Sequence, residues 1–302
     1  MKHASILSLA ALAALATLAT LATPAHAAVT VVDDDGNKVT LQQPAQRIVA
    51  MAPHVTELLF AAGGGAKIVG AVSYSDFPEA AKRIAQIGSN RQVDMERVIA
   101  LKPDLIVVWL HGSSERQVAE LRALGIPMFH SEPRKLDDIV ASVQKMGKLM
   151  GTEAVAEPAA AGLRQELADL RKRYANRPPV RMFYQVWDKP LYTLNGSHIV
   201  SDAIGLCGGV NIFASLKVTA PIVNVEAVLQ QDPEAIFSTG ERSLDDGGVN
   251  LWKPYANMTA VKRANLFRLD GNLLNRAGPR MVAGTAALCE KLELARQHRL
   301  AK

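Results

Sequence analysis

The sequence predicts an α/β fold made of two parallel-sheet lobes joined by a single long helix. Three observations predict it. From Arg47 onward, short apolar runs alternate with amphipathic stretches of helical length, which is typical of a parallel sheet covered by helices. A long, charged helical pattern interrupts this alternation near the middle of the chain. The segment 93–107 then recurs at 223–237, a shift of 223 − 93 = 130 positions, which indicates two lobes of related design.

The first 27 residues have the composition of a cleaved export signal. Lys2 supplies a positive charge, an Ala- and Leu-rich run extends from Ile6 to Ala22, and Ala25-His26-Ala27 has the small-x-small form that signal peptidase accepts. No second apolar stretch of membrane-spanning length follows, and no Cys stands at the cleavage site for lipid attachment. We therefore expect a mature protein in the periplasm, with a retained membrane helix as the alternative.

We expect the first lobe to occupy residues 28–152. Its short apolar runs are typical of buried strands, and the amphipathic stretches between them are typical of helices. The strands are predicted at Ile48–Ala52, Ile68–Val72, Leu105–Val108 and Pro127–His130, and the clearest helices at Met95–Leu101, Glu115–Leu124 and Leu136–Met150.

The connecting helix is predicted at residues 153–177. Leu163, Leu167 and Leu170 follow one another at four- and three-residue steps, and charged residues fill the other faces. Asn176-Arg177-Pro178-Pro179 ends the pattern, since proline cannot continue a helix. The second lobe is expected at 178–302 and begins with a strand at Val180–Val186.

The internal repeat describes the same helix-to-strand unit twice. Each copy has a helix opened by an N-cap side chain, Asp94 or Asn224, and a glutamate at the second helical position, Glu96 or Glu226. Acidic side chains are favoured there by the helix dipole. Each helix stops before a proline and leads into a buried strand. The matched glutamates favour a duplicated role, although helix-to-strand junctions often look alike, so chance similarity is the alternative.

Charge distribution and motif content argue against two classes of function. The net charge of +5 comes from basic residues scattered along the chain, whereas a nucleic-acid-binding protein needs a clustered basic face. The sequence has no Gly-x-Ser-x-Gly elbow, no phosphate-cradling Gly-x-x-x-x-Gly-Lys and no His-Glu-x-x-His. We therefore expect neither nucleic-acid binding nor catalysis, with a secreted hydrolase as the distant alternative.

Candidate ligand contacts follow the predicted strands. In a parallel sheet, ligands bind where the carboxyl ends of the strands and the loops after them meet. The side chains at those positions are His54, Tyr74, Trp109, His111 and His130 in the first lobe, and Gln185, Trp187 and Asp188 in the second. Trp109 and Trp187 at matching strand ends would form facing walls suited to a large, flat, partly apolar ligand. Trp252 lies inside an amphipathic stretch and is predicted to pack in a core.

The histidines and cysteines give no metal site by their spacing. His54, His111 and His130 are too far apart in the sequence for a compact motif and have few acids nearby, so no tight zinc or manganese site is predicted. A single histidine could still be an axial ligand to the iron or cobalt of a macrocycle. Cys207 and Cys289 form a plausible disulfide in an oxidising compartment, with two buried thiols as the alternative.

Four segments together resemble a known family. They are Tyr74-Ser75-Asp76-Phe77-Pro78, the run from Glu96 to Leu105, Glu115-Arg116-Gln117-Val118, and Cys207-Gly208-Gly209-Val210-Asn211-Ile212-Phe213. Nearly all of the chain after residue 27 is similar to the periplasmic cobalamin-binding receptors of ABC importers. These receptors belong to a wider group of helical-backbone metal and chelate receptors, the class III periplasmic binding proteins, which also includes siderophore and haem carriers. The resemblance implies that fold, with a long backbone helix between two α/β lobes.

The resemblance also implies roles for individual residues. Glu96 and Glu226 match the glutamates that such receptors offer to arginines on the two permease subunits. Tyr74 and Trp109 match aromatic ligand contacts, and Arg276 matches a polar contact. Cys207 and Cys289 match the disulfide of the family.

Several positions depart from the family pattern. Asn272, Leu273, Leu274 and Asn275 stand where aspartate, tryptophan, phenylalanine and glutamate usually precede the matched arginine, and Ala220 stands where a ligand-facing tryptophan is usual. The matching motifs therefore identify the architecture better than the ligand.

The sequence as a whole predicts a monomeric periplasmic receptor that needs no cofactor and delivers its cargo to the permease dimer of an ABC importer. The expected cargo is cobalamin or a related corrinoid, and haem and ferric siderophores are the alternatives. The expected ligand contacts are Tyr74, Trp109, Trp187, Asn272, Arg276, His54 and His111. The stiff connecting helix predicts only a small closure on ligand binding.

Overall fold

The first lobe is built on a four-stranded parallel sheet with the strand order β4-β3-β5-β6. A computed structural model describes residues 28–89, 92–239 and 247–300. The strands are β3 (Ile48–Ala50), β4 (Ile68–Ala71), β5 (Leu105–Val108) and β6 (Met128–His130). Each predicted strand is confirmed, and three of the four are one or two residues shorter than predicted. Strands β3 and β5 are buried along their whole length, which explains their unbroken apolar sequence.

An antiparallel hairpin precedes this sheet and was not predicted. It consists of β1 (Val29–Val32) and β2 (Lys38–Leu41), joined by a turn in which Asp33 accepts hydrogen bonds from the backbone of Asp35 and Asn37. The predicted export signal, residues 1–27, lies outside the described residues. Among the residues that the structure describes, no helix has the length and apolarity needed to cross a membrane.

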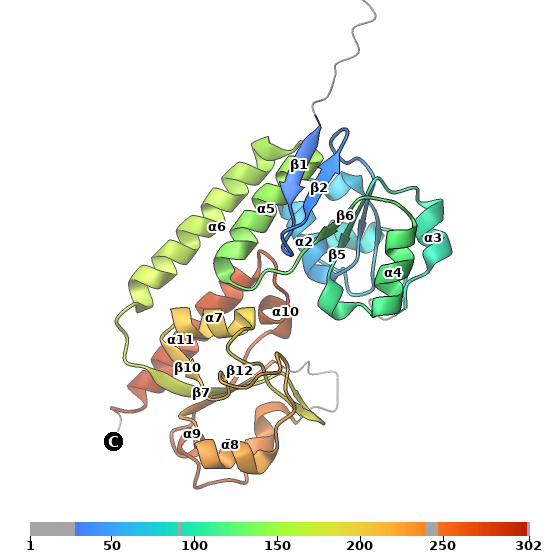
Figure 1. Cartoon of the computed structure of the whole chain (residues 1–302). Coiled ribbons are helices and arrows are strands. Elements are labelled where there is room, and N and C mark those ends of the chain that lie inside the picture. Colours follow the sequence, from blue (N-terminus) through green and yellow to red (C-terminus); the bar gives the residue numbers. More distant parts are fainter. Residues whose placement is uncertain (1–27, 90–91, 240–246, 301–302) are drawn as a thin grey trace, which may run out of the picture.

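Helices cover the first sheet on both faces (Figure 1). They are α2 (Pro53–Ala61), α3 (Met95–Ala100), α4 (Glu115–Ala123) and α5 (Leu136–Met150), with short 3-10 turns η2 (Gly65–Lys67), η3 (Glu79–Arg83) and η4 (Leu110–Gly112). The predicted helices α3, α4 and α5 are confirmed, and α5 has the predicted ends.

A single long helix, α6 (Glu153–Tyr174), connects the two lobes, as predicted. Gly151 ends α5 in the left-handed conformation, with φ of 65°, and allows the chain to turn sharply into α6. The two helices then lie side by side (Figure 1). They can approach closely because Gly147 has no Cβ, and a Cβ there would collide with the Cβ of Ala156. This tight pair forms a stiff support on one side of the molecule.

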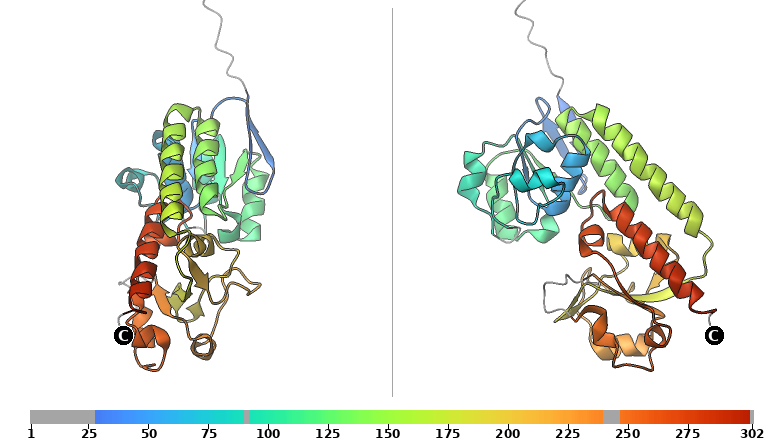
Figure 2. Two further views of the ribbon diagram at one scale, coloured as in Figure 1. Left: turned by 90° about the vertical axis from the view of Figure 1, so that its left-hand side faces the viewer. Right: turned by 180° about the vertical axis from the view of Figure 1, so that it is seen from behind.

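The second lobe is built on a parallel sheet with the strand order β10-β7-β11-β12. Its strands are β7 (Val180–Gln185), β10 (Gly209–Asn211), β11 (Ala235–Ser238) and β12 (Leu266–Arg268), beside a small hairpin of β8 (Trp187–Asp188) and β9 (Leu191–Tyr192). The helices are α7 (Ile199–Leu206), α8 (Val225–Gln231), η5 (Gly248–Trp252), α9 (Thr259–Lys262), α10 (Gly271–Leu274) and α11 (Met281–Gln297). Helix α11 contacts both α6 and α7 (Figure 2).

The two sheets share one topology. Numbered along the chain within each lobe, the four parallel strands are arranged in the order 2-1-3-4 in both. The repeat found in the sequence accounts for this likeness, since β5 and β11 begin at equivalent positions, 105 + 130 = 235. The predicted fold class, two parallel-sheet lobes joined by one long helix, is confirmed.

Two features of the second lobe stabilise it. Cys207 at the end of α7 is bonded to Cys289 in α11, and their Cα atoms are 4.8 Å apart, so the predicted disulfide is formed. Trp252 is fully buried, and its Nε1 donates a hydrogen bond of 2.7 Å to Gln185 Oε1. Trp252 therefore belongs to the core, as predicted. Its hydrogen bond holds the side chain of Gln185 in the interior, so Gln185, a candidate cleft residue, does not line the cavity.

Candidate ligand-binding cavity

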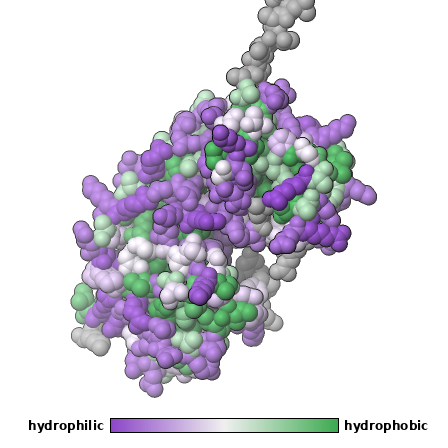
Figure 3. Space-filling model, viewed as in Figure 1, coloured by the Kyte–Doolittle hydropathy of each residue, from purple (hydrophilic) through white to green (hydrophobic). Residues whose placement is uncertain are grey.

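A cavity of about 800 Å³ lies between the two lobes, at the carboxyl ends of both sheets. The surface is hollowed between the lobes, on the side away from α6 (Figure 3). This position follows from the topology, since parallel strands direct the loops that follow them to one edge of the sheet. The volume is in the range of small-molecule sites, which run from about 300 to about 1,000 Å³.

The first lobe supplies an aromatic and imidazole wall. Tyr74 follows β4, Trp109 and His111 follow β5, and His54 lies in the first turn of α2. Tyr74 is 76% exposed and has a φ of 66°, in the left-handed region that non-glycine residues seldom adopt. Backbone strain of this kind is concentrated at functional sites.

The second lobe supplies a wall of smaller and mostly aliphatic side chains. Val186 follows β7, and Leu194 and Ile199 lie near the start of α7. Ala220 leaves room opposite the aromatic wall, and Asn275 adds one amide group. The two walls together combine apolar surface with few polar groups, which is the usual character of a small-molecule site.

Five of the seven ligand contacts predicted from the sequence line this cavity: His54, Tyr74, Trp109, His111 and Arg276. Trp187 and Asn272 do not line it. Val186 lines the cavity in place of Trp187, because neighbouring residues of an extended chain point to opposite sides. Trp187 Nε1 instead donates to the carbonyl of Lys189, at 3.0 Å, within its own hairpin. The residues after α10 reach the cavity in place of Asn272.

Two histidines on opposite walls are held in the neutral form by burial. Burial lowers the pKa of His54 to about 4 and the pKa of His198 to about 4. The ring of His54 meets the edge of Trp109, with 5.8 Å between the ring centroids. At neutral pH both imidazoles are therefore uncharged and add little to the polarity of the cavity.

An ion-pair network joins the lobes beside the cavity. Arg276 Nη1 donates to Asp76 Oδ1 at 2.6 Å. Arg280 donates to both carboxylate oxygens of Glu57, at 2.6 and 3.0 Å, and its guanidinium lies 4.0 Å from the ring centroid of Phe77. Burial raises the pKa of Asp76, but Arg276 more than offsets this and holds that pKa below its usual range. Arg276 thus faces the cavity and is paired with an acid at the same time.

Comparisons with known proteins are consistent along most of the chain. A model of the periplasmic binding protein family matches residues 48–273. The chain belongs to this family. The vitamin B12-binding protein of Vibrio cholerae is 37% identical over 255 residues, which are 84% of this chain and 91% of that protein. The vitamin B12-binding protein of Yersinia pestis is 37% identical over 250 residues, which are 83% of this chain and 87% of that protein.

A solved structure supports the same assignment. The crystal structure of the periplasmic vitamin B12-binding protein BtuF of Vibrio cholerae has a TM-score of 0.78 at 36% identity and covers 84% of this chain and 98% of its own. The haem-binding protein RhuT of Roseiflexus sp. RS-1 has a TM-score of 0.71 at 24% identity over 83% of this chain and 99% of its own, so it shares the fold. The resemblance inferred from the sequence motifs is confirmed.

This periplasmic binding protein displays the two repeat glutamates on the outside of its lobes. Glu96 and Glu226 are both exposed, each as the second residue of its helix, α3 or α8 (Figure 1). The helices are capped alike, since Asp94 accepts from Arg97 N at 2.9 Å and Asn224 from Ala227 N at 2.8 Å. The two carboxylates are therefore presented in equivalent local settings.

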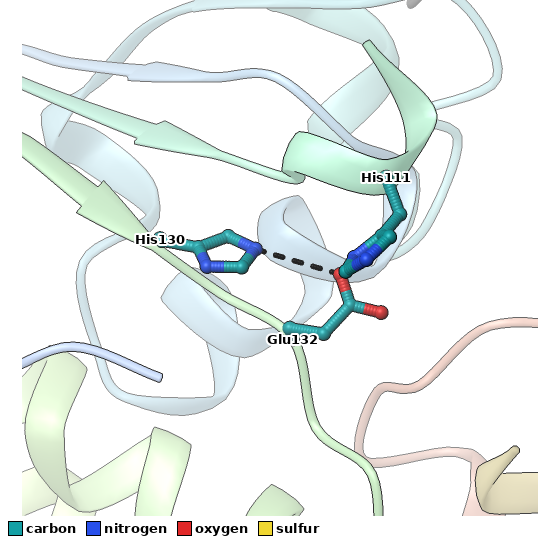
Figure 4. A group of neighbouring side chains, drawn as sticks. All are labelled: His111, His130 and Glu132. Carbon is teal, nitrogen blue, oxygen red and sulfur yellow. Dashed lines mark hydrogen bonds and ion pairs between the residues drawn. The ribbon is translucent and has the colours of Figure 1, made fainter. Parts of the chain in front are cut away.

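The sequence named His111 and His130 as strand-end residues, but it did not predict Glu132 or the cluster that the three residues form at the cavity wall. His111, His130 and Glu132 place one ligand atom each within 4.8 Å of one another (Figure 4). The expectation of few acids near these histidines was wrong, because it counted neighbours along the chain. Strands β5 and β6 are adjacent, so the residues after them meet in space. The rule that loops after parallel strands converge could have found Glu132, which follows β6 by two positions.

Proposed function

We propose that this chain is the periplasmic substrate-binding component of an ABC importer, and that it binds cobalamin or a related corrinoid between its lobes. The observation that carries this proposal is the 37% identity to vitamin B12-binding proteins, which extends over 84% of the chain. The proposed binding residues are Tyr74, Trp109, His54, His111 and Arg276, which line the cavity. In this role the protein acts as a monomer in the periplasm and has no catalytic task.

The cavity walls suit a broad, flat chelate. Aromatic side chains stack on flat faces and exclude water, and Tyr74 and Trp109 supply two of them on the first lobe. The opposing wall combines aliphatic side chains with small polar ones and is opened by Ala220, so a thick macrocycle fits better than a thin aromatic ring. Arg276 supplies N–H donors for the amide and phosphate oxygens that surround a corrin.

The outer carboxylates suit delivery to a two-fold permease. Glu96 and Glu226 offer one exposed acid on each lobe, in matched helix-start settings. Carboxylates accept arginine guanidinium groups in a two-pronged geometry, which fixes docking register. The proposed partner is therefore a permease dimer in the inner membrane that offers one basic group per subunit.

Titration calorimetry of the mature protein with cyanocobalamin tests the ligand. We expect binding of one molecule per chain, and a 10- to 100-fold weaker affinity, on the order of 2 kcal/mol, after Trp109→Ala. Trp187→Ala is the matched control, because it removes a tryptophan that does not line the cavity, and it should leave the affinity unchanged. An absence of cyanocobalamin binding would overturn the proposal.

Haem is the second candidate ligand, and the imidazoles at the cavity wall are the observation that favours it. His54 and His111 both line the cavity, and neutral imidazole is a common axial ligand of haem iron. The visible spectrum of the protein after mixing with hemin separates the two ligands. A haem spectrum that changes in His111→Ala, without any binding of cyanocobalamin, would favour haem.

A further inference from the structure

The first-lobe wall of the cavity contains a compact group of metal-ligating side chains, His111, His130 and Glu132. One ligand atom from each lies within 4.8 Å of the others (Figure 4). His111 and Glu132 line the cavity, whereas His130 lies behind them with only 3% of its side chain exposed. The group is therefore half embedded in the protein and half open to the cleft.

The fold brings these residues together from separate loops. In the parallel pair of β5 and β6, Val108 lies opposite His130, so both strands end at the same level. His111 lies on η4, directly after β5, and Glu132 follows the end of β6. The arrangement is a consequence of the sheet and does not depend on sequence spacing.

One ring nitrogen from each histidine lies close to the same carboxylate oxygen of Glu132. Glu132 Oε2 lies 2.8 Å from His111 Nδ1 and 3.5 Å from His130 Nε2. In a tetrahedral zinc site, with metal–ligand bonds of about 2.0–2.2 Å, neighbouring ligand atoms are about 3.4 Å apart. The separation between Glu132 and His130 is thus nearly met. The two separations that involve His111 need a movement of its side chain, 63% of which is exposed.

A second layer of groups holds the ligands in place. His130 Nδ1 lies 2.7 Å from Asp35 Oδ2, where an outer carboxylate commonly orients a metal-bound histidine. The backbone N–H of Glu132 donates to Asp34 Oδ2 at 2.7 Å, and Lys145 Nζ pairs with Asp34 Oδ1 at 2.7 Å. Neither ring nitrogen of the buried His130 makes a hydrogen bond of good geometry, although both face acids. The carboxylates therefore orient the buried ring of His130, but its nitrogens still lack good hydrogen bonds.

We propose that His111, His130 and Glu132 bind a divalent transition-metal cation, with zinc as the best match. Two imidazoles and one carboxylate are a known ligand set for zinc, and three protein ligands leave the fourth coordination position open. That position faces the cavity, because His111 and Glu132 line it. A dication also balances the nearby carboxylates of Glu132, Asp35 and Asp34, of which Asp34 is already paired with Lys145.

Metal titration of the mature protein tests this site. The protein is treated with EDTA, dialysed, and titrated with Zn²⁺ by calorimetry and with Co²⁺ by absorption spectroscopy, without any corrinoid present. We expect one cation per chain, and visible bands of tetrahedral Co²⁺ that Zn²⁺ displaces. Glu132→Gln and His130→Gln should each weaken binding at least 10-fold, and Asp35→Asn should weaken it about 10- to 100-fold through the orientation of His130.

His298→Gln is the matched control, since His298 bonds to Asn265 in the second lobe, far from the cluster in sequence and in fold. It should bind zinc as the unchanged protein does. A thermal melt of each variant without metal establishes that it is folded. The proposal is overturned if the protein binds no Zn²⁺, or if Glu132→Gln and His130→Gln bind it as tightly as the unchanged chain. In that case His130 acts only as a cation paired with two carboxylates.

This site does not depend on the proposed cargo. Cyanocobalamin titrated in the presence of EDTA measures corrinoid binding alone, and Zn²⁺ titrated without corrinoid measures the cation site alone. A failure of either proposal is therefore distinguishable from a failure of the other.

Discussion

The two lobes share a backbone design but differ in the surface that they turn toward the cavity. Both have the strand order 2-1-3-4, and both present an exposed glutamate at the second position of a capped helix. The first lobe lines the cavity with Tyr74, Trp109 and imidazoles, whereas the second lobe lines it mainly with aliphatic and small side chains. The repeat is thus visible at the two outer helices and is not visible in the side chains that line the cavity.

This difference has a simple physical reason under the proposed function. A permease dimer with two-fold symmetry offers the same group twice, so equal carboxylates on the two lobes match it. A single cargo molecule has two unlike faces, so the walls that hold it gain nothing from being alike. A receptor that binds a symmetric permease and an asymmetric ligand therefore needs similar outer surfaces on its two lobes and different cavity walls.

The largest expected effect comes from reversing both repeat glutamates. Glu96→Lys together with Glu226→Lys should weaken association with the permease at least 100-fold, because each change replaces an attraction with a repulsion. Each single variant should lose about half of that free energy, if the lobes are equivalent. The affinity is measured by surface plasmon resonance against the cognate transporter in nanodiscs.

Glu115→Lys is the control for this experiment. Glu115 is also an exposed glutamate in the first turn of a helix, α4, but it lies outside the repeated segment 93–107. It should leave docking unchanged, and all of these variants should bind cargo normally because none of the three side chains lines the cavity. Unequal losses from Glu96→Lys and Glu226→Lys would show that the permease distinguishes the lobes.

A smaller effect should follow from removing the disulfide, which only the second lobe has. Cys207→Ser with Cys289→Ser frees a loop closed over a sequence separation of 82, and the expected loss in the free energy of unfolding is about 2–5 kcal/mol. Hydrogen exchange should accelerate in β11 much more than in the equivalent strand β5. Equal acceleration in both strands would mean that the lobes unfold as one unit.

The smallest effect concerns pH, through one histidine in each wall, buried His54 and partly buried His198. The pKa of His54 and that of His198 are about 4 in the folded protein, below the ordinary value of 6.5. The unfolded chain therefore binds more protons between pH 6.5 and pH 4, so stability is complete above pH 6.5 and is lost as the pH falls towards 4. Each histidine should contribute a slope of about 1 kcal/mol per pH unit near pH 5.

Urea unfolding at several pH values measures these slopes. His54→Asn and His198→Asn should each reduce the slope by about 1 kcal/mol per pH unit, and asparagine keeps the N-cap that His198 provides for α7. Glu132 adds a slope of the same sign below about pH 5.5. Burial raises its pKa, but the neighbouring His130, His111 and Trp109 outweigh burial, so the pKa is about 2 in the folded protein and near 4.5 in the unfolded chain. Each variant is therefore compared with the unchanged chain at the same pH, so that this contribution cancels. If neither variant changes the slope, His54 and His198 are not the source of this pH dependence.

The sequence predicted the fold better than the site. Helix α5 has the predicted ends and α6 begins where predicted, because Gly151 is a strong local stop signal and the apolar periodicity on either side of it is clear. The β1–β2 hairpin was missed, because each of its strands has only four residues and little apolar contrast. Short alternating strands carry a weak signal.

The sequence predicted the cavity residues only where it also predicted the end of the strand before them. His54, Tyr74, Trp109 and His111 were found because the ends of β3, β4 and β5 could be placed. Trp187 was placed in the cavity wrongly, because β7 ends at Gln185, one residue before the predicted end. Val186 and Trp187 therefore point to opposite sides, and Val186 is the residue that faces the cavity. The cluster around Glu132 depends on which strands are neighbours, and strand order is not written in local sequence patterns.

The pairing of Arg276 sets a condition on what the cavity can hold. Its Nη1 is already bonded to Asp76 and to Glu57, so a ligand that engages this group either accepts from the remaining N–H donors or displaces one of these carboxylates. Arg280 meanwhile keeps its own two bonds to Glu57 on the opposite lobe. One arginine can therefore change partners while its neighbour continues to fasten the lobes. Under the proposed function, a ligand that displaces Asp76 from Arg276 would therefore leave the Arg280–Glu57 bridge between the lobes intact.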